Sequence, residues 1–457
     1  MANEIQASTR KELFGHPAGL YVLFFTELWE RFSYYGMRAI LVLFLVAETK
    51  NGNPGWGWDD VSALNLYMWY TMFVYVMSIP GGLIADRLLG QKKTVMLGGI
   101  LLVLGHGSLA LKPDWAFYLG LVLIVLGVGG LKPNISSMVG GLYPPGDDRR
   151  DKGFTIFYIG INIGALMSAL IVGYVGEKIG WHYGFGLAGI GMLLGLLVYV
   201  YGQRYLHGVG DFIGKGDRPE KEEMNKPLTP VEKDRMKVMF LSFLLIIVFW
   251  GAFEQAGGLM NLYADQKTNR FLNIFGGFEV PASWFQSVNS FFIITLGTAV
   301  AGFWYRRNHK GKEASSLFKM AIGVIIMGWG FLFMSAASLQ YDAQGSSAMY
   351  WLILAYLFHT VGELSASPVA LSFITKLAPV KYASFMMGAY FAASGLGNML
   401  AGTLGKASRS FGELGIFMGI AIFCTLTGLI VLLALKPLKR LTHGAEDVPH
   451  PDPKTAS

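Results

Sequence analysis

Long apolar stretches recur along the chain, each long enough to cross a membrane as a helix. A helix needs about 20 residues to span the roughly 30 Å hydrocarbon core of a bilayer. The stretches fall into two sets of six, and a polar segment separates the sets. The first set covers residues 18–46, 62–85, 94–111, 117–138, 153–175 and 183–203, and the second covers 236–263, 284–305, 315–338, 349–376, 382–405 and 412–435. We therefore predict an all-α membrane protein with twelve transmembrane helices in two six-helix halves.

Paired halves suggest how the chain is divided into units. They are the plan of secondary transporters, in which one half moves against the other around a site near the middle of the membrane. The chain has 457 residues, of which 53% are hydrophobic and 15% charged, which excludes a soluble enzyme with a large core. We expect an N-terminal segment at 1–17, an N-terminal six-helix bundle at 18–203, a linker at 204–235, a C-terminal six-helix bundle at 236–436 and a tail at 437–457.

The distribution of Lys and Arg predicts the orientation in the membrane. Basic residues gather before the first span, in alternate loops and in the linker, whereas the opposite loops hold few. By the positive-inside rule, both termini and the linker are cytoplasmic, in a multi-pass protein of the cell inner membrane. The same loops account for the net charge of +7, so we expect no nucleic-acid partner. No cleaved signal peptide is expected before the first span.

A stripe of polar side chains runs along the first span. At about 100° per residue, Glu27, Arg31, Tyr34 and Arg38 fall within an arc of about 60°, with Glu30 and Tyr35 on its flanks. Each charge at the bilayer centre costs about 2.5–3.5 kcal/mol, so such groups face a water-filled cavity or a partner. The stripe therefore predicts a cavity between helices, although a structural Glu/Arg pair that joins two helices is an alternative.

Three more ionisable residues lie deep in later spans. Lys132 in the fourth span and Glu363 in the tenth lie at nearly the same depth, and Glu254 in the seventh matches Arg38. Two pairs between the halves are therefore plausible, the second nearer the outside. Lys132 could instead extend its ammonium toward the cytoplasm.

Signatures of catalysis and of ATP coupling are missing. The sequence contains no Gly-x4-Gly-Lys-Ser/Thr phosphate loop, no His-Glu-x-x-His and no Cys/His cluster. The single cysteine, Cys424, excludes an intramolecular disulfide and is expected to be a small core residue. We expect no enzyme activity and no cofactor.

The first-span stripe carries a specific motif. Residues 27–36, Glu-Leu-Trp-Glu-Arg-Phe-Ser-Tyr-Tyr-Gly, resemble the ExxERFxYYG signature of proton-dependent oligopeptide transporters, the POT/PTR family of the major facilitator superfamily. The resemblance continues over nearly the whole chain. It covers the hairpin at 81–93, the lysine motif at 130–134, the FYxxINxG segment at 157–164, and the stretches at 249–255, 284–289 and 362–368.

The resemblance implies a major facilitator fold and a proton-coupled symporter that imports di- and tripeptides by alternating access. Arg31 and Lys132 would hold the peptide carboxylate, and Glu363 with Asn162 and Asn289 would hold its amino terminus. Tyr34, Tyr35 and Tyr75 match substrate-lining tyrosines. Glu27, Glu30 and Glu254 would be the proton-coupling residues, and Arg38 with Glu254 would form an outer gate. Protons are the only coupling ion expected, and we expect a monomer in the bilayer.

Several alternatives stay open within this resemblance. Asn162 and Asn289 could be interhelical hydrogen-bonding residues, and Tyr35 could only pack. Tyr390 stands where relatives often carry a tryptophan, which bears on side-chain selectivity. A same-family transporter of nitrate or another small anion is the nearest rival function; a drug/proton antiporter and a sensor or passive channel are more remote.

Overall fold

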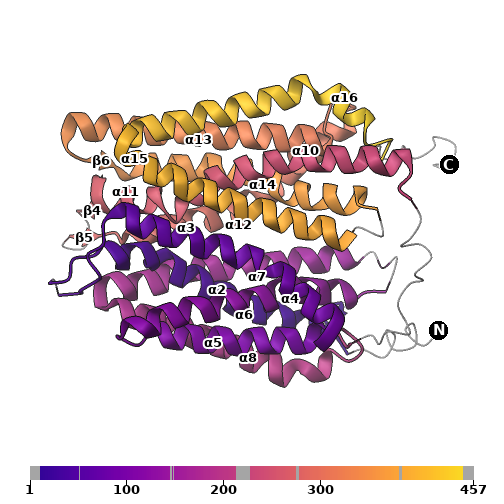
Figure 1. The fold of residues 1–457 in the computed structure, drawn as a ribbon, viewed down its shortest axis with the longest axis horizontal. Helices are drawn as coiled ribbons and strands as arrows, with labels where there is room; N and C mark the ends of the chain where they lie inside the picture. Colours follow the sequence, from indigo (N-terminus) through magenta and orange to yellow (C-terminus); the bar gives the residue numbers. More distant parts are fainter. Residues whose placement is uncertain are drawn as a thin grey trace.

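The computed structural model describes residues 11–50, 52–144, 147, 149–212, 227–273, 277–379 and 383–445. The described helices lie side by side in one bundle and run between its two ends (Figure 1). We call the end where α2 begins and α16 lies the base, and the opposite end, which carries α11 and the short strands β4, β5 and β6, the top. The base is on the right of Figure 1 and the top is on the left.

The six spans of the N-terminal half alternate in direction between base and top, and several of them consist of consecutive helical segments. They are α2 (Ala18–Val46), α3 (Asp60–Val76), α4 (Ser78–Ile84), the π-helix η1 (Ala85–Leu89), α5 (Gln91–Leu109), α6 (Asp114–Gly141), α7 (Arg149–Tyr174), the π-helix η2 (Val175–Ile179), α8 (Trp181–Gly202) and the 3₁₀-helix η3 (Gln203–Tyr205). A two-residue hairpin of β1 (Glu12–Leu13) and β2 (His16–Pro17) precedes α2.

The C-terminal half follows the same plan. Its helices are α10 (Pro230–Phe253), the 3₁₀-helix η5 (Glu254–Ala256), α11 (Leu259–Lys267), the 3₁₀-helix η6 (Ala282–Trp284), α12 (Phe285–His309), α13 (Ser316–Gln344), α14 (Met349–Leu377), α15 (Ala383–Leu433) and α16 (Leu435–Arg440). Four short strands lie at the top. They are β3 (Thr268–Asn269), paired with β6 (Ser347–Ala348), and β4 (Phe271–Leu272), paired with β5 (Phe278–Glu279).

The described helices account for twelve membrane crossings. In the described part of the chain, nine segments are long and apolar enough to span a membrane. α2 is not among the nine because it carries four charges, and α5 is not because it begins with Gln91-Lys92-Lys93. The last of the nine, Met386–Leu433, is two helices that meet at Gly412, where a φ of 71° turns the chain. The two added helices and this division bring nine to the expected twelve.

Local sequence explains several helix boundaries. Thr229 and Glu232 cap each other's backbone groups at the start of α10, and Pro230 occupies its first position. Asp59 accepts hydrogen bonds from the Ser62 hydroxyl and from the backbone N–H groups of Ser62 and Val61 at the start of α3, and those bonds lower the pKa of its carboxyl group. These polar starts carry the helices beyond the apolar stretches that hydropathy detects.

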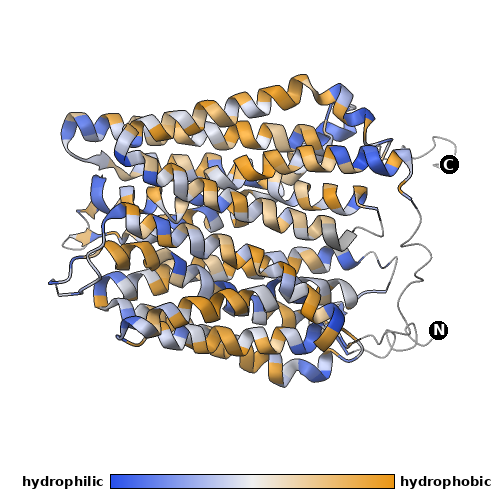
Figure 2. Cartoon of the chain, in the orientation of Figure 1, coloured by the Kyte–Doolittle hydropathy of each residue, from blue (hydrophilic) through white to orange (hydrophobic). Residues whose placement is uncertain are grey.

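The outer surface of the bundle is apolar along its length. Figure 2 shows hydrophobic colours on the outward faces and hydrophilic residues concentrated at the two ends. Large side chains on this surface are exposed, such as Leu244, Phe423 and Leu433. Exposed apolar area of this extent suits the hydrocarbon core of a bilayer and would be a liability in water.

Glycines let helices approach closely inside the N-terminal half. A Cβ atom at Gly81 in α4 would lie 2.0 Å from the carbonyl oxygen of Gly129 in α6. Asn134 of α6 donates a hydrogen bond to the Gly81 carbonyl at 3.4 Å. Small residues at crossings are the usual means by which membrane helices gain packing contacts.

We expect Gly81→Ala to destabilise the protein by about 1–3 kcal/mol, because a methyl group there overlaps backbone that cannot move aside. Gly82→Ala is the matched control, since a Cβ at Gly82 meets nothing within 4 Å. Thermal unfolding of purified protein in detergent measures both variants. Equal melting temperatures for the two variants would contradict this packing argument.

Candidate functional site

The polar stripe of α2 is buried in the N-terminal half. Glu30 has no exposed surface, and Glu27 and Arg31 are each 2% exposed. Arg31 Nε lies 2.9 Å from Glu27 Oε1 and also contacts the Glu30 carboxylate. The guanidinium carbon lies 5.7 Å from the ring centres of both Tyr34 and Tyr35. α2 is held here by close packing, because a Cβ at Gly164 of α7 would lie 2.2 Å from the carbonyl of Leu28.

Several polar atoms of this cluster have no hydrogen-bond partner among the described residues. Within the described part of the chain, Arg31 Nη2 is buried and makes no hydrogen bond. Glu27 Oε2 and Glu30 Oε1 of the same cluster are likewise buried without a hydrogen-bond partner in that part of the chain, so the cluster holds polar groups that a proton or a ligand would satisfy.

A cavity of about 570 Å³ lies between the two halves, and Arg31 is one of its lining residues. Nine of the residues singled out from the sequence line it, namely Glu27, Arg31, Tyr35, Arg38, Tyr75, Lys132, Asn162, Asn289 and Glu363. Glu30, Tyr34 and Glu254 lie behind the lining. The lining runs from Arg38 and Tyr356, toward the top, to Ser137 and Thr375, close to the points where α6 and α14 end at the base.

The cationic side of the cavity is formed by α2 and α6. Lys132 comes from α6, next to Pro133, and its Nζ lies 4.1 Å from the centre of the Tyr75 ring. A lysine over an aromatic face keeps its charge available to other partners. Lys132 and Glu363 line the same cavity without forming an ion pair with each other within 4.0 Å.

The anionic side is formed by α12 and α14. Glu363 Oε2 accepts a hydrogen bond from Asn289 Nδ2 at 2.8 Å, and the same nitrogen donates to Thr360 Oγ1 at 3.0 Å. Asn289 therefore joins two helices and fixes the carboxylate. Asn162 differs from it, because its amide donates to the Tyr158 carbonyl of its own helix α7 at 2.9 Å.

Arg38 and Glu254 meet at the upper end of the cavity. Their side chains approach to 3.3 Å, and Tyr67 Oη lies 3.4 Å from Glu254 Oε2. Glu254 is the first residue of η5, directly after the end of α10. The change from α-helix to 3₁₀-helix in the seventh span places its carboxylate next to α2. Above the pair, Asn261 donates to the Ala39 carbonyl at 2.9 Å. The Arg38–Glu254 pair, which the sequence suggested because the two residues lie at similar depths in their spans, is therefore formed and joins the two halves.

Besides Tyr35 and Tyr75, the lining contains aromatic residues that were not assigned to the cavity from the sequence. Tyr158, Trp250, Phe253, Tyr356 and Phe391 line the cavity together with Tyr390, and the Tyr75 and Trp250 rings lie 6.2 Å apart. Gln286 also lines it, and its buried Nε2 makes no hydrogen bond in the described part of the chain. An aromatic residue within an apolar span looks like any other core residue, so only the three-dimensional arrangement distinguishes this group.

Solved structures with this arrangement are transporters. The protein is similar to the crystal structure of a peptide transporter POT in complex with sulfate, with a TM-score of 0.87 and 33% sequence identity, over 96% of this chain and 99% of the other. The helices, the cavity and this likeness define a multi-pass membrane transporter with the major facilitator fold.

Sequence comparisons give the family. The model of the POT family matches residues 92–211 and 221–414. A di-/tripeptide transporter of Lactococcus lactis subsp. cremoris is 35% identical, over 95% of this chain and 98% of its own length. A peptide transporter of Yersinia enterocolitica subsp. palearctica is 34% identical, over 95% and 97%. The chain belongs to the POT family.

Removing one member of the buried Arg38–Glu254 pair should destabilise the protein strongly. Arg38→Leu leaves Glu254 as a buried charge without its cation, which typically costs about 3–5 kcal/mol. The double variant Arg38→Leu/Glu254→Leu removes both charges and should recover most of the loss. Denaturant unfolding of the four proteins in a double-mutant cycle measures the coupling.

Arg409→Leu provides the control for that cycle. Arg409 lies 3.8 Å from Asp59 and is largely exposed, so its loss should cost less than about 1 kcal/mol. If Arg38→Leu were no more destabilising than Arg409→Leu, the buried pair would not contribute as described.

Proposed function

We propose that this transporter imports di- and tripeptides together with protons. The observation that carries the proposal is the separation of charge across the cavity, with Arg31 and Lys132 on one side and Glu363 on the other. A peptide zwitterion has opposite charges at its two ends. It therefore fits a cavity whose opposite walls supply a cation pair and an anion.

Arg31 and Lys132 are the proposed partners of the peptide carboxylate. Arg31 lines the cavity, and its guanidinium would donate hydrogen bonds to a carboxylate oxygen once a neighbouring Glu takes up a proton. Glu363, oriented by Asn289, would take the amino terminus. Tyr35, Tyr75 and Asn162 would contact the peptide from the lining, and Tyr34 would support Arg31 from behind. The names of the Lactococcus and Yersinia relatives, given above, support peptides as the substrate class.

Glu27 and Glu30 are the proposed proton carriers nearest the substrate. While ionised, they occupy the Arg31 guanidinium and compete with a peptide carboxylate for it. A proton on one of them would release Arg31, so proton and peptide would favour each other's binding. One charge that moves down 100 mV gains about 2.3 kcal/mol, which corresponds to roughly fifty-fold accumulation.

Alternating access completes the proposed cycle. The base faces the cytoplasm of a bacterial inner membrane, as the basic loops predict, and the bundles at 18–203 and 236–436 move against each other. Arg38 pairs with Glu254 at the upper end of the cavity, and the lining extends toward the base; both observations support a closed gate at the top. Protonation of Glu254 would weaken that pair and favour opening of the top to the outside.

Uptake of labelled dialanine into proteoliposomes tests the function. We expect accumulation that requires an inward proton gradient and that excess unlabelled dipeptide abolishes, whereas free alanine has no effect. Glu30→Gln should retain exchange of dialanine but lose gradient-driven accumulation, because it removes a proton site and keeps the side-chain shape. Competition by nitrate alone would favour the small-anion alternative and sink the peptide proposal.

Recognition of the peptide's amino group gives a second test. Glu363→Gln should weaken dialanine binding at least about tenfold and leave N-acetyl-dialanine binding nearly unchanged, since charge-assisted hydrogen bonds contribute about 1.5–3 kcal/mol. Displacement of a bound radiolabelled dipeptide measures both ligands. Glu413→Gln, which alters a carboxylate paired with Lys267 outside the cavity lining, is the control. An equal loss for both ligands would contradict the assignment of Glu363.

A further inference from the structure

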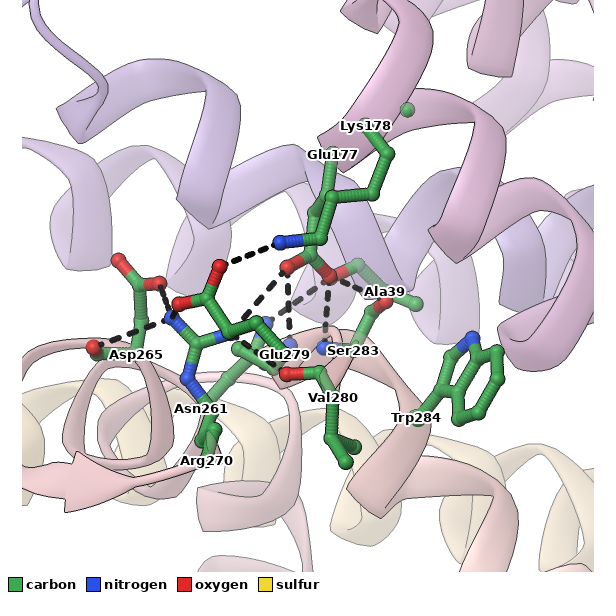
Figure 3. Close-up of polar contacts among 12 residues, drawn as sticks. Ala39, Glu177, Lys178, Asn261, Asp265, Arg270, Glu279, Val280, Ser283 and Trp284 are labelled. Carbon is green, nitrogen blue, oxygen red and sulfur yellow. Dashed lines mark hydrogen bonds and ion pairs between the residues drawn. The ribbon is translucent and has the colours of Figure 1, made fainter. Parts of the chain in front are cut away.

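A second set of contacts joins the two halves at the top, away from Arg38 and Glu254. Figure 3 shows Glu177 and Lys178 reaching from the N-terminal half toward Arg270, Glu279 and Ser283 of the C-terminal half. Glu177 and Lys178 belong to η2, and their partners lie between α11 and α12. None of these residues was singled out from the sequence.

Glu177 binds the backbone at the start of a helix that belongs to the other half. Its Oε2 accepts a hydrogen bond from the Ala282 N–H at 2.8 Å. Its Oε1 accepts one from the Ser283 N–H at 2.9 Å and one from Ser283 Oγ at 2.5 Å. Ala282 begins η6, which continues directly into α12. The residue before it is Pro281, whose side chain has no oxygen to accept these bonds.

The carboxylate thus acts as a helix cap supplied by the opposite half. The first N–H groups of a helix have no partner within it, and the helix dipole favours a negative charge at that end. If the halves separate at the top, the Glu177 contacts are lost and these N–H groups lose their acceptor. The cap therefore stabilises the arrangement in which the top is closed.

Charged side chains around the cap tie the same two segments together. Arg270 is 9% exposed, and it contacts Glu177 at 3.8 Å and Asp265 at 2.7 Å while donating to the Val280 carbonyl at 2.8 Å. Lys178 pairs with Glu279 at 2.5 Å, and this ammonium lowers the pKa of the Glu279 carboxyl group. Glu279 is therefore ionised, and the pair is a charged one across the two halves.

α7 of the N-terminal half also packs tightly against η6 of the C-terminal half next to the cap. A Cβ atom at Gly173 of α7 would lie 2.1 Å from Ser283 Oγ. Trp284 of η6 donates from Nε1 to the Leu170 carbonyl of α7 at 2.9 Å. Any side chain at position 173 would push Ser283 away from Glu177.

The chain uses the same backbone device at the base. At the base, the five-residue π-helix η1 and Gly90 connect α4 to α5; at the top, the five-residue π-helix η2 and Gly180 connect α7 to α8. The connection at the base lies in the stretch at 81–93, which resembles the superfamily's hairpin between spans two and three. The top hairpin, with Glu177 and Lys178, is its counterpart at the opposite end.

We propose that Glu177, assisted by Lys178, is a positioning residue of the transport cycle that holds the top closed by capping α12 across the two halves, as a gate separate from Arg38–Glu254. The proposal rests on alternating access as the proposed function. We call the contact of Glu177 with the Ala282 and Ser283 N–H groups the latch. Loss of the latch is expected to move the conformational equilibrium toward the state that is open at the top.

Pulsed electron resonance on spin-labelled protein in nanodiscs tests this without peptide or a proton gradient. Labels at Lys112 and Gln344 report the distance between the halves at the top, and labels at Lys93 and Lys310 report it at the base; all four positions are exposed. Cys424 is buried and need not be replaced. Glu177→Ala should raise the ratio of top-open to top-closed protein at least about tenfold, with a matching decrease of the base distance.

Two further variants keep the test decisive. Gly173→Ala should shift the distances in the same direction, because its methyl group displaces Ser283, and Glu177→Gln should have an intermediate effect because it keeps one acceptor oxygen. Asp342→Ala, at an exposed carboxylate at the same end, is the matched control and should change nothing. Disorder from simple destabilisation would broaden both distance distributions, whereas the latch predicts opposite shifts at top and base.

The outcome separates this proposal from the proposed function. Unchanged distances in folded Glu177→Ala and Gly173→Ala proteins, together with gradient-driven dialanine uptake by the wild type, would overturn the latch alone. Shifted distances without any dialanine uptake would support the latch and reject the peptide function.

Discussion

The ion cluster on α2 is the constraint on which the rest of the structure depends. Two carboxylates share one guanidinium in a helix that runs through the N-terminal bundle. With both acids ionised, the three α2 side chains carry one excess negative charge inside the bundle, which Lys132 of the same cavity offsets only from a distance. A proton is the smallest species that removes this excess. A site built in this way is suited to couple the arrival of a proton to the release of Arg31.

The features that the sequence predicted are those that break an apolar background. Glu27, Arg31 and Arg38 stand out because charges within a span need a physical reason, and helical periodicity places them on one face. The twelve crossings follow from hydropathy in the same way. The predicted helix boundaries were less accurate than the number of spans. The capping box of Thr229 and Glu232 starts α10 in polar sequence, which a search for apolar stretches does not include.

Other features could not be predicted because nothing in the linear sequence marks them. Tyr356 and Phe391 resemble ordinary core residues until the fold places them at the cavity. Glu177 and Lys178 lie at the end of a span, where charges are common, and the partners of Glu177 are mainly backbone N–H groups. Backbone partners leave no trace in the residue types, so contacts of this kind are visible only in three dimensions.

The close connection between the top contacts and the substrate cavity lies in a single helix. α12 begins beside the N–H groups that Glu177 caps, and Asn289, which orients Glu363, lies in its first two turns. Loss of the cap would allow the first turn to fray, and amide hydrogens there would exchange with water more rapidly. The order of the first turns of α12 therefore links the top to the cavity. When the top opens and these turns loosen, Asn289 holds the Glu363 carboxylate less firmly.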